Sequence, residues 1–386
     1  MDPIENYPQG HWVVGDKKFI NKYEALLYAT EKNLSVKYKF FDEIWEKYNK
    51  DNLGKISLQE VYKQRAQQLR DKYDYLILYF SGGADSYNVL RSFIDNGIKL
   101  DEVCVKWSND TLTANTQIYK PNTQEESAWN YLSEWDYAIK PVLDKLTQTN
   151  PEIKIEIVDW FKNKDLIGAE EIFKLVNHWH DVEVTSLAVW SPSEAKLVDQ
   201  GKSVGSIYGV DKPQIYFEDD GVAYMIFIDS ATTMGTPNPC NIYGTEYFYW
   251  APDFPLITFE TAFRAVEAFR TDPLLQGSKF DKDVKTDITV FSNRNREQQK
   301  NLRHILYDNW TDNFQAGKPI ALNRADKHFW IYQSPELKYF KDSYQDMINL
   351  HTKQLRADLY RTGGWPGSTE RTSMYKFITT KKFLIS

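Results

Sequence analysis

Apolar strand-like runs alternate with amphipathic helical stretches in the first half of the chain. Residues 75–80, Tyr-Leu-Ile-Leu-Tyr-Phe, are continuously apolar over a length too short for a buried helix, which predicts a central parallel strand. From Ala84 onward, apolar residues recur at helical spacing until Asn96-Gly97 ends the predicted helix. Two further strands and the helix between them are predicted at 102–107, 153–158 and 124–146. This order of elements predicts an open α/β parallel sheet, whose ligand site lies beyond the carboxyl ends of the strands.

The residues before and after this α/β pattern predict further helices and a hairpin. Ser57 and Glu60 form a capping box, and helical spacing predicts a helical N-terminal region with helices at 24–30, 40–48 and 58–69. After residue 166 the pattern predicts a hairpin of 214–217 with 222–228, and short helices at 169–179, 193–200, 261–270 and 294–308. We therefore expect a helical N-terminal region over 1–72, an α/β domain over 73–270 and a mixed, mostly helical C-terminal region over 271–386.

The composition is that of a folded globular protein. The 386 residues include 54 acidic and 47 basic side chains, for a net charge of -7, and 42% hydrophobic residues, which excludes a disordered or collagen-like chain. The first residues lack the basic and apolar segments of a secretion signal, so we expect a cytoplasmic protein with no membrane partner. Cys104 and Cys240 are too few for a zinc knuckle, a redox dithiol or an iron–sulfur cradle. The aromatic fraction of 15% predicts rings in the core and in pocket walls.

The strongest chemical signal lies between the first strand and its helix, in the run Ser81-Gly82-Gly83-Ala84-Asp85-Ser86. Its two glycines let the backbone approach an anion closely, and the loop amides and the helix N-terminus direct positive partial charge toward that anion. Its two serines add hydroxyl donors. A carboxylate at Asp85 suits an anion site only if a Mg²⁺ ion shares the phosphates and takes the carboxylate as a ligand. The run therefore predicts a pyrophosphate site with its metal, and the alternative is an ordinary glycine turn.

This run resembles the SGGxDS loop, or PP-loop, of the ATP pyrophosphatase superfamily, and it matches every defining position. The arrangement is also similar to asparagine-synthetase-like members and to uncharacterised PP-loop proteins of tailed phages. The resemblance implies an adenine nucleotide alpha hydrolase-like core that binds ATP and Mg²⁺ through residues 81–86. It further implies a ligase that transfers AMP to a carbonyl or carboxylate, releases pyrophosphate and displaces the AMP with ammonia or an amine.

Residues outside the loop extend the resemblance more weakly. By position, Val105 and Trp107 at the end of the second strand are expected to lie beside the adenine. After a further predicted strand, Asp211 is placed to bind the metal and Lys212 to bind a phosphate, and a charged surface turn is an equal alternative. Asp85 and Lys212 are therefore the candidate catalytic residues, and Asp85 and Asp211 the candidate metal ligands.

Departures from the superfamily narrow the chemistry. The two isolated cysteines cannot supply the sulfur carrier or cluster of thiolases, and residue 2 is Asp where an amidotransferase domain has its cysteine. We therefore expect ammonia or an amine as the nucleophile, and an acceptor that is a small molecule, a nucleotide or RNA. The alternative is a nucleotide-sensing or structural module that binds ATP without turning it over.

Two other metal-like patterns are weaker. Residues 49–60 partly match an EF-hand loop, but Asn49 stands where the first aspartate is needed and Leu53 supplies no side-chain oxygen. His178 and His180 would point to different sides of a helix. We expect no metal at either place.

Overall fold

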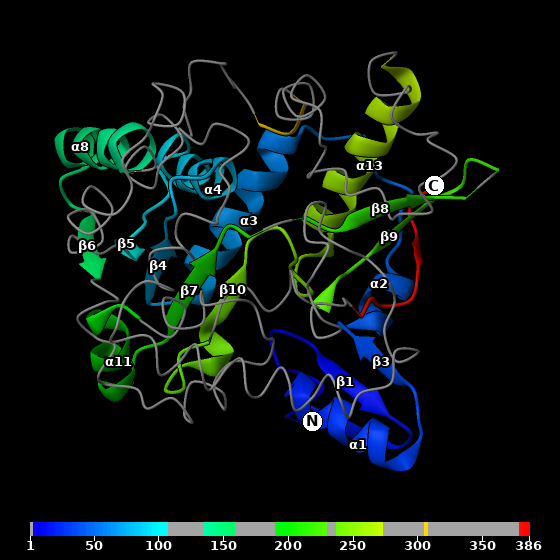
Figure 1. Cartoon of the computed structure of the whole chain (residues 1–386). Coiled ribbons are helices and arrows are strands. Elements are labelled where there is room, and N and C mark those ends of the chain that lie inside the picture. Colours follow the sequence, from blue (N-terminus) through cyan, green and yellow to red (C-terminus); the bar gives the residue numbers. More distant parts are fainter. Residues whose placement is uncertain are drawn as a thin grey trace, which may run out of the picture.

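A parallel β-sheet forms the centre of the protein (Figure 1). The computed structural model describes residues 3–106, 135–158, 190–210, 212–218, 220–229, 237–272, 305–307 and 378–386. The strands of the central sheet are β4 (Tyr75–Tyr79), β5 (Glu102–Lys106), β6 (Lys154–Val158), β7 (Val204–Tyr208) and β10 (Thr245–Tyr247). Their order across the sheet is β10-β7-β4-β5-β6, and every neighbouring pair is parallel. The predicted open α/β parallel sheet is confirmed.

The strand order creates a switch point between β4 and β7. The chain begins the sheet at β4, moves outward through β5 and β6, and then returns to the other side of β4 for β7 and β10. The connections that follow β4 and β7 run in opposite directions, so a space opens between them beyond the carboxyl ends of these strands. Open α/β sheets bind ligands in such a space. The run at 81–86 starts at this place.

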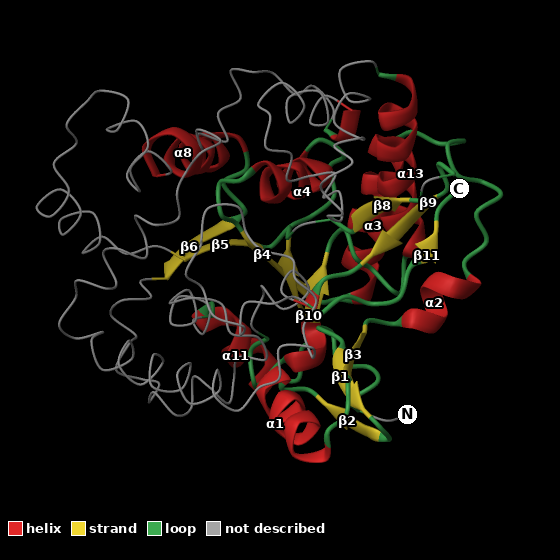
Figure 2. Cartoon of the chain, turned by 45° about the vertical axis from the view of Figure 1, so that its right-hand side comes forward, coloured by secondary structure: helices red, strands yellow, loops and turns green. Residues whose placement is uncertain are grey.

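Helices cover both faces of the central sheet. α4 (Ala84–Ile94) and α8 (Lys140–Thr149) lie on one face, and α11 (Pro192–Asp199) lies on the other (Figure 2). A π-helical turn, Trp135–Ile139, leads into α8, and the first part of the helix predicted at 124–146 lies outside the described residues. None of the described helices combines the length and the apolar character needed to cross a membrane.

The N-terminal region contains a small antiparallel sheet as well as helices. Its strands are β1 (His11–Val14), β2 (Lys17–Phe19) and β3 (Val36–Lys39), in the order β2-β1-β3. The three predicted helices are confirmed as α1 (Lys22–Lys32), α2 (Asp42–Lys47) and α3 (Leu58–Lys72). The prediction of a helical N-terminal region did not include these three strands. Strands of three or four residues are too short for alternation to be distinguished in the sequence, even where β3 does alternate buried and exposed side chains.

A hairpin and the last residues of the chain form a third sheet. The predicted hairpin is confirmed as β8 (Gln214–Phe217) and β9 (Ala223–Ile226), which pair antiparallel. β11 (Phe383–Leu384) adds to the other side of β9. The end of the chain thus lies against a hairpin that the sequence places in the α/β domain.

Two of the remaining predicted helices are confirmed, and two lie entirely or almost entirely outside the described residues. The helix predicted at 193–200 is α11, and the one predicted at 261–270 is α13 (Pro255–Thr271), which begins earlier because a proline is well suited to the first turn of a helix. The helix predicted at 169–179 and nearly all of 294–308 lie outside the described residues. The helical character of the C-terminal region and the domain boundaries stay predictions.

A buried ion pair joins the N-terminal region to the third sheet. Lys22 Nζ lies 2.7 Å from Asp229 Oδ2, and both side chains are almost completely buried. Trp12 Nε1 donates to the same carboxylate at 3.2 Å, and the backbone N–H of Ile378 donates to it at 3.1 Å. Burial lowers the pKa of Lys22, and the charge of Asp229 opposes that shift. The pair therefore fixes three distant parts of the chain to one another.

Aromatic side chains form one cluster in the core. Phe40, Trp45, Phe227 and Trp250 are buried, and their neighbouring ring centroids lie 4.9 to 6.3 Å apart. For these residues the predicted use of aromatic rings in the core is confirmed. Cys104 is also buried, and burial raises the pKa of its thiol, which suits a core residue and not a nucleophile.

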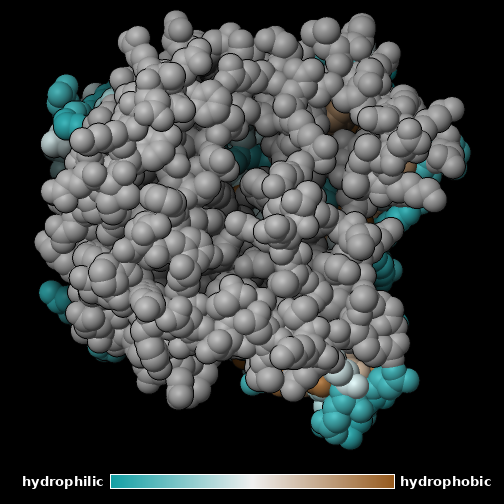
Figure 3. All heavy atoms as spheres, in the orientation of Figure 1, coloured by the Kyte–Doolittle hydropathy of each residue, from teal (hydrophilic) through white to brown (hydrophobic). Residues whose placement is uncertain are grey.

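The surface of the N-terminal region is mostly hydrophilic where described side chains are visible (Figure 3). Large hydrophobic residues exposed there include Ile20 and Leu34, which are 38% and 40% exposed. Isolated apolar side chains of this kind are ordinary on a soluble surface.

Asp101, just before β5, ties α3 to the sheet. Its carboxylate accepts hydrogen bonds from Arg70 at 2.6 Å and from the Leu76 amide at 2.9 Å, and it forms an ion pair with Lys99 at 2.7 Å. Burial alone would raise the pKa of Asp101, but the bonds from Lys99, Arg70 and Leu76 outweigh it, so the pKa is lowered.

The first prediction concerns this carboxylate. Asp101→Asn should lower the free energy of unfolding by about 1–3 kcal/mol near pH 7. A lowered pKa stabilises the fold above the pKa of the unfolded chain, about 4, and that stability disappears as the pH falls through the lower folded value. In urea unfolding from pH 7 to pH 2.5, the gap between variant and wild type should be constant at first and shrink below about pH 4. A gap that does not change with pH would contradict this role.

Candidate functional site

The run at 81–86 forms a tight loop at the carboxyl end of β4. The loop continues from the sheet, since the Phe80 amide donates to the Cys104 carbonyl at 2.8 Å. Gly82 has φ of +73°, a conformation that favours glycine, and an added Cβ would lie 2.8 Å from Ile139 Cγ1. Gly83 is the N-cap of α4 and has no side chain with which to cap the helix. The first amides of α4 are therefore left for other acceptors, as in loops that bind phosphate.

The two serines of the loop are held by hydrogen bonds within it. Ser81 Oγ accepts from the Gly83 amide at 3.3 Å and lies 3.3 Å from Ser86 Oγ. Ser86 Oγ donates to the Gly83 carbonyl at 3.1 Å. Ser86 is buried and Ser81 is exposed. Ser86 thus fixes the shape of the loop, and Ser81 presents its hydroxyl at the surface.

The loop after β7 brings Lys212 to this site. Lys212 Nζ forms an ion pair with Asp85 Oδ1, in the first turn of α4. The Lys212 side chain is 1% exposed and the Asp85 side chain 32%, so Lys212 does not lie on a surface turn. Two candidate residues from different loops are therefore in direct contact at the switch point.

Two tyrosines that the sequence did not single out also contact Lys212. Tyr249, just after β10, places its ring centroid 4.1 Å from Lys212 Nζ, and its hydroxyl donates to the Asp85 carbonyl at 3.1 Å. Asn88 Nδ2 donates to that hydroxyl at 2.9 Å, and burial raises the pKa of Tyr249. Tyr307 donates its hydroxyl hydrogen to the Asp85 carboxylate and accepts from Lys212 Nζ. These two residues come from distant stretches among 25 tyrosines, and no spacing in the sequence marks them.

The other predicted site residues have different positions. Ala84 is the first residue of α4 and is half-buried. Val105 is completely buried in the core, so its side chain has no surface open to a ligand in this conformation. Trp107 and Asp211 lie outside the described residues, as do His178 and His180. Their proposed roles stay predictions.

A lysine at the end of β5 was also missed. The half-buried Lys106 places Nζ 4.9 Å from the ring centroid of Tyr79 and 5.8 Å from that of Tyr208. These two rings, at the ends of β4 and β7, stack with centroids 4.7 Å apart. Burial lowers the pKa of Lys106 to about 8, so its charge near neutral pH is sensitive to its surroundings. The carboxyl edge of the sheet thus carries a second cation beside an aromatic wall.

The EF-hand-like segment at 49–60 binds a helix. The Gly54 amide donates to both carboxylate oxygens of Glu260 in α13, at 2.9 and 3.2 Å. Arg264 donates to the carbonyls of Gly54 and Ile56 at 3.0 and 2.8 Å. Among the described residues, no group of three or more His, Cys, Asp or Glu side chains is arranged to hold a metal ion. The described contacts of this segment are therefore those of a structural joint.

The second prediction tests the close approach of the two loops. A Cβ added at Gly209 would lie 2.8 Å from Ser86 Cα and 2.9 Å from Ser86 N, which are backbone atoms that cannot move independently. Gly209→Ala should push the β7 loop away from α4 and lower the free energy of unfolding by about 1–3 kcal/mol, measured by urea unfolding. A loss within the error of the measurement would show that the loops are not packed this tightly.

Comparison of the chain with protein-family models, with curated proteins and with solved structures finds no match.

Proposed function

We propose that the protein is an ATP pyrophosphatase-type ligase that binds ATP and Mg²⁺ at the run 81–86. In this proposal it transfers AMP to a carbonyl or carboxylate of an acceptor, releases pyrophosphate, and displaces the AMP with ammonia or an amine. The observation that carries the proposal is the SGGADS run at the switch point between β4 and β7, with Asp85 and Lys212 in contact there. The same proposal assigns the sheet to the adenine nucleotide alpha hydrolase-like class.

The groups at the site suit a metal-bound pyrophosphate. The first amides of α4 and the backbone around Gly82 supply donors for phosphate oxygens. Mg²⁺ in nucleotide sites is commonly held by one or two carboxylates together with phosphates and water, so the partly exposed carboxylate of Asp85 fits it. Lys212 supplies a positive charge for a phosphate oxygen.

The contact between Asp85 and Lys212 also suggests how the site responds to its ligand. Before binding, each side chain neutralises the other. When Mg²⁺ and a phosphate arrive together, Asp85 can pair with the metal and Lys212 with the phosphate, so neither charge is left without a partner. The bound ion would stabilise the negative charge that develops on the departing pyrophosphate. The protein itself positions the nucleotide, and no side-chain nucleophile is needed.

The experiment that tests this function is a product profile. Purified full-length protein is incubated with ATP, Mg²⁺ and a cell extract that supplies acceptors. We expect AMP and pyrophosphate above the level of the extract alone, and we expect this excess to be absent with Asp85→Asn. Formation of ADP and phosphate, or an equal yield of AMP from the variant, would contradict the proposal.

A nucleotide-binding module without catalysis is the second candidate. It is favoured by the burial of Lys212, whose ammonium is enclosed by Asp85, Tyr249 and Tyr307. In this case ATP would bind and remain intact with every acceptor tested.

A further inference from the structure

Tyr307 brings a third part of the chain into the contact between Asp85 and Lys212. Its hydroxyl is hydrogen-bonded to both side chains, and its ring centroid lies 4.8 Å from Lys212 Nζ. Asp85 follows β4, Lys212 follows β7, and Tyr307 belongs to the described segment 305–307. The site is therefore assembled from stretches that are far apart in the sequence.

We propose that Tyr307 is a positioning residue of the nucleotide site, which holds the Lys212 ammonium in place for a phosphate. The inference deepens the proposed function and rests on it in one respect, the identity of the ligand as a phosphate group.

Burial places strict demands on the Lys212 side chain. A lysine has a flexible four-carbon stem and three N–H donors, and a buried ammonium is stable only where its charge and donors are satisfied. Lys212 is 1% exposed, its ammonium forms an ion pair with Asp85, and the Tyr307 hydroxyl accepts one of its hydrogen bonds. The faces of two tyrosine rings add favourable contacts with the cation. Because the side chain is already ordered, binding a phosphate costs less conformational entropy.

Tyr307 is itself fixed by the packing of its segment. Tyr307 and Leu306 are both buried, and Tyr62 in α3 donates its hydroxyl hydrogen to the Leu306 carbonyl at 2.9 Å. The two tyrosine hydroxyls therefore have separate tasks. The hydroxyl of Tyr62 anchors the segment, and the hydroxyl of Tyr307 contacts the charged pair. Tyr62→Phe is accordingly a matched control for Tyr307→Phe, since each removes one buried hydroxyl and keeps the ring.

The first measurement uses the full chain without nucleotide. Each protein is labelled with an amine-reactive ester, and modification of Lys212 is followed by mass spectrometry, with the exposed Lys47 as an internal reference. We expect Lys212 to be labelled several-fold faster in Tyr307→Phe than in wild type, while labelling of Lys47 is unchanged. Tyr62→Phe should label Lys212 at close to the wild-type rate. Unchanged labelling in Tyr307→Phe, or equal acceleration in both variants, would overturn the proposal.

The second measurement is the affinity for α,β-methylene-ATP with Mg²⁺. Loss of a hydrogen bond to a charged group should weaken binding by about ten-fold in Tyr307→Phe and leave Tyr62→Phe near wild type. Tighter binding by Tyr307→Phe would overturn the proposal, because the hydroxyl would then compete with the ligand. If wild type binds no nucleotide, the proposed function fails, and the labelling experiment still decides whether Tyr307 positions Lys212.

Discussion

Lys212→Met is expected to weaken the binding of Mg²⁺·ATP by about 100-fold, because it removes a charged hydrogen bond and the positive charge that faces a phosphate. The loss should occur with and without Mg²⁺. Asp85→Asn should behave differently, since its proposed ligand is the metal. Its affinity for ATP in EDTA should be close to that of wild type, and Mg²⁺ should no longer strengthen binding. Titration calorimetry with and without EDTA separates the two effects.

Folding must be controlled in this experiment. Lys212→Met leaves a carboxylate that is 32% exposed and can be hydrated, so the fold should tolerate it. Asp85→Asn leaves a buried ammonium without its charged partner, so its thermal unfolding must be compared with wild type at the temperature of the titration. Lys47→Met is a suitable control, because Lys47 is exposed and its ion pair among the described residues is an i,i+4 pair with Glu43 on α2. Equal binding by wild type and Lys212→Met would contradict the assignment of Lys212.

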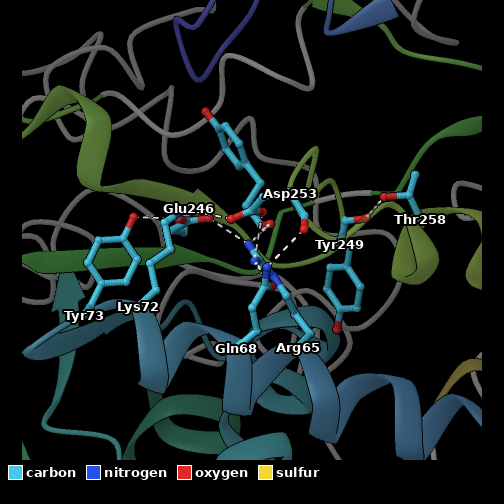
Figure 4. A network of polar contacts seen from close by, with 9 residues as sticks. Arg65, Gln68, Lys72, Tyr73, Glu246, Tyr249, Asp253 and Thr258 are labelled. Carbon is cyan, nitrogen blue, oxygen red and sulfur yellow. Dashed lines mark hydrogen bonds and ion pairs between the residues drawn. The ribbon is translucent and has the colours of Figure 1, made fainter. Parts of the chain in front are cut away.

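A buried network of charged side chains around Arg65 contributes to the stability of the fold. Arg65 in α3 is completely buried and reaches toward β10 and the loop that follows it (Figure 4). Its guanidinium donates to Glu246 at 2.7 Å, to the Tyr247 carbonyl at 3.2 Å and to Asp253 at 3.2 Å. Lys72 contacts the same two carboxylates at 2.6 and 2.8 Å. This network fastens α3 to the edge of the central sheet.

Arg65→Met should lower the free energy of unfolding by about 3 kcal/mol. Removing one partner of a buried pair leaves the other buried and less compensated, but Glu246 keeps Lys72 and Tyr73, so the loss should fall at the lower end of the range for such pairs. Arg65→Lys should restore little, because one ammonium cannot replace the planar guanidinium fork. Urea unfolding checks both variants.

Lys63→Met is the control for the Arg65 variants. Lys63 lies on the same helix and is 50% exposed, and its ion pair with Glu60, within the part of the chain that the structure describes, is long at 3.8 Å. Its loss should change stability by less than about 0.5 kcal/mol. If Arg65→Met lowered the free energy of unfolding by less than about 0.5 kcal/mol, the network would not fasten α3 to the sheet.

The central strand and its loop could be predicted because their signals are local. Residues 75–80 form an apolar run of strand length, and the glycines that follow belong to a recognisable loop. By contrast β10 was not predicted, because the middle one of its three residues is the acidic Glu246, whose contacts with Arg65, Lys72 and Tyr73 depend on the tertiary fold. A tertiary contact of this kind leaves no local pattern.

In the candidate site, too, some residues could be predicted from the sequence and others could not. Asp85 could be chosen because it belongs to the Ser81–Ser86 run, and Lys212 because it stands next to an acidic residue after a predicted strand. Tyr249 and Tyr307 could not be chosen, because their hydroxyls reach Asp85 through tertiary packing that the sequence does not reveal. Gly205 in β7 shows that packing can also hide a strand. An added Cβ at this position would lie 2.6 Å from a ring carbon of Tyr73, so the close packing requires glycine. Glycine is uncommon inside strands, and β7 is therefore hard to recognise from the sequence.

Binding of nucleotide to the Ser81–Ser86 loop can be measured without an acceptor, by calorimetric titration of the full-length wild-type protein with α,β-methylene-ATP and Mg²⁺. We expect one site per chain with a dissociation constant of roughly 1 µM to 1 mM, competition by pyrophosphate, and loss of the signal in Lys212→Met. Absence of binding, or binding that survives both pyrophosphate and the substitution, would contradict the assignment of the Ser81–Ser86 loop as a nucleotide site.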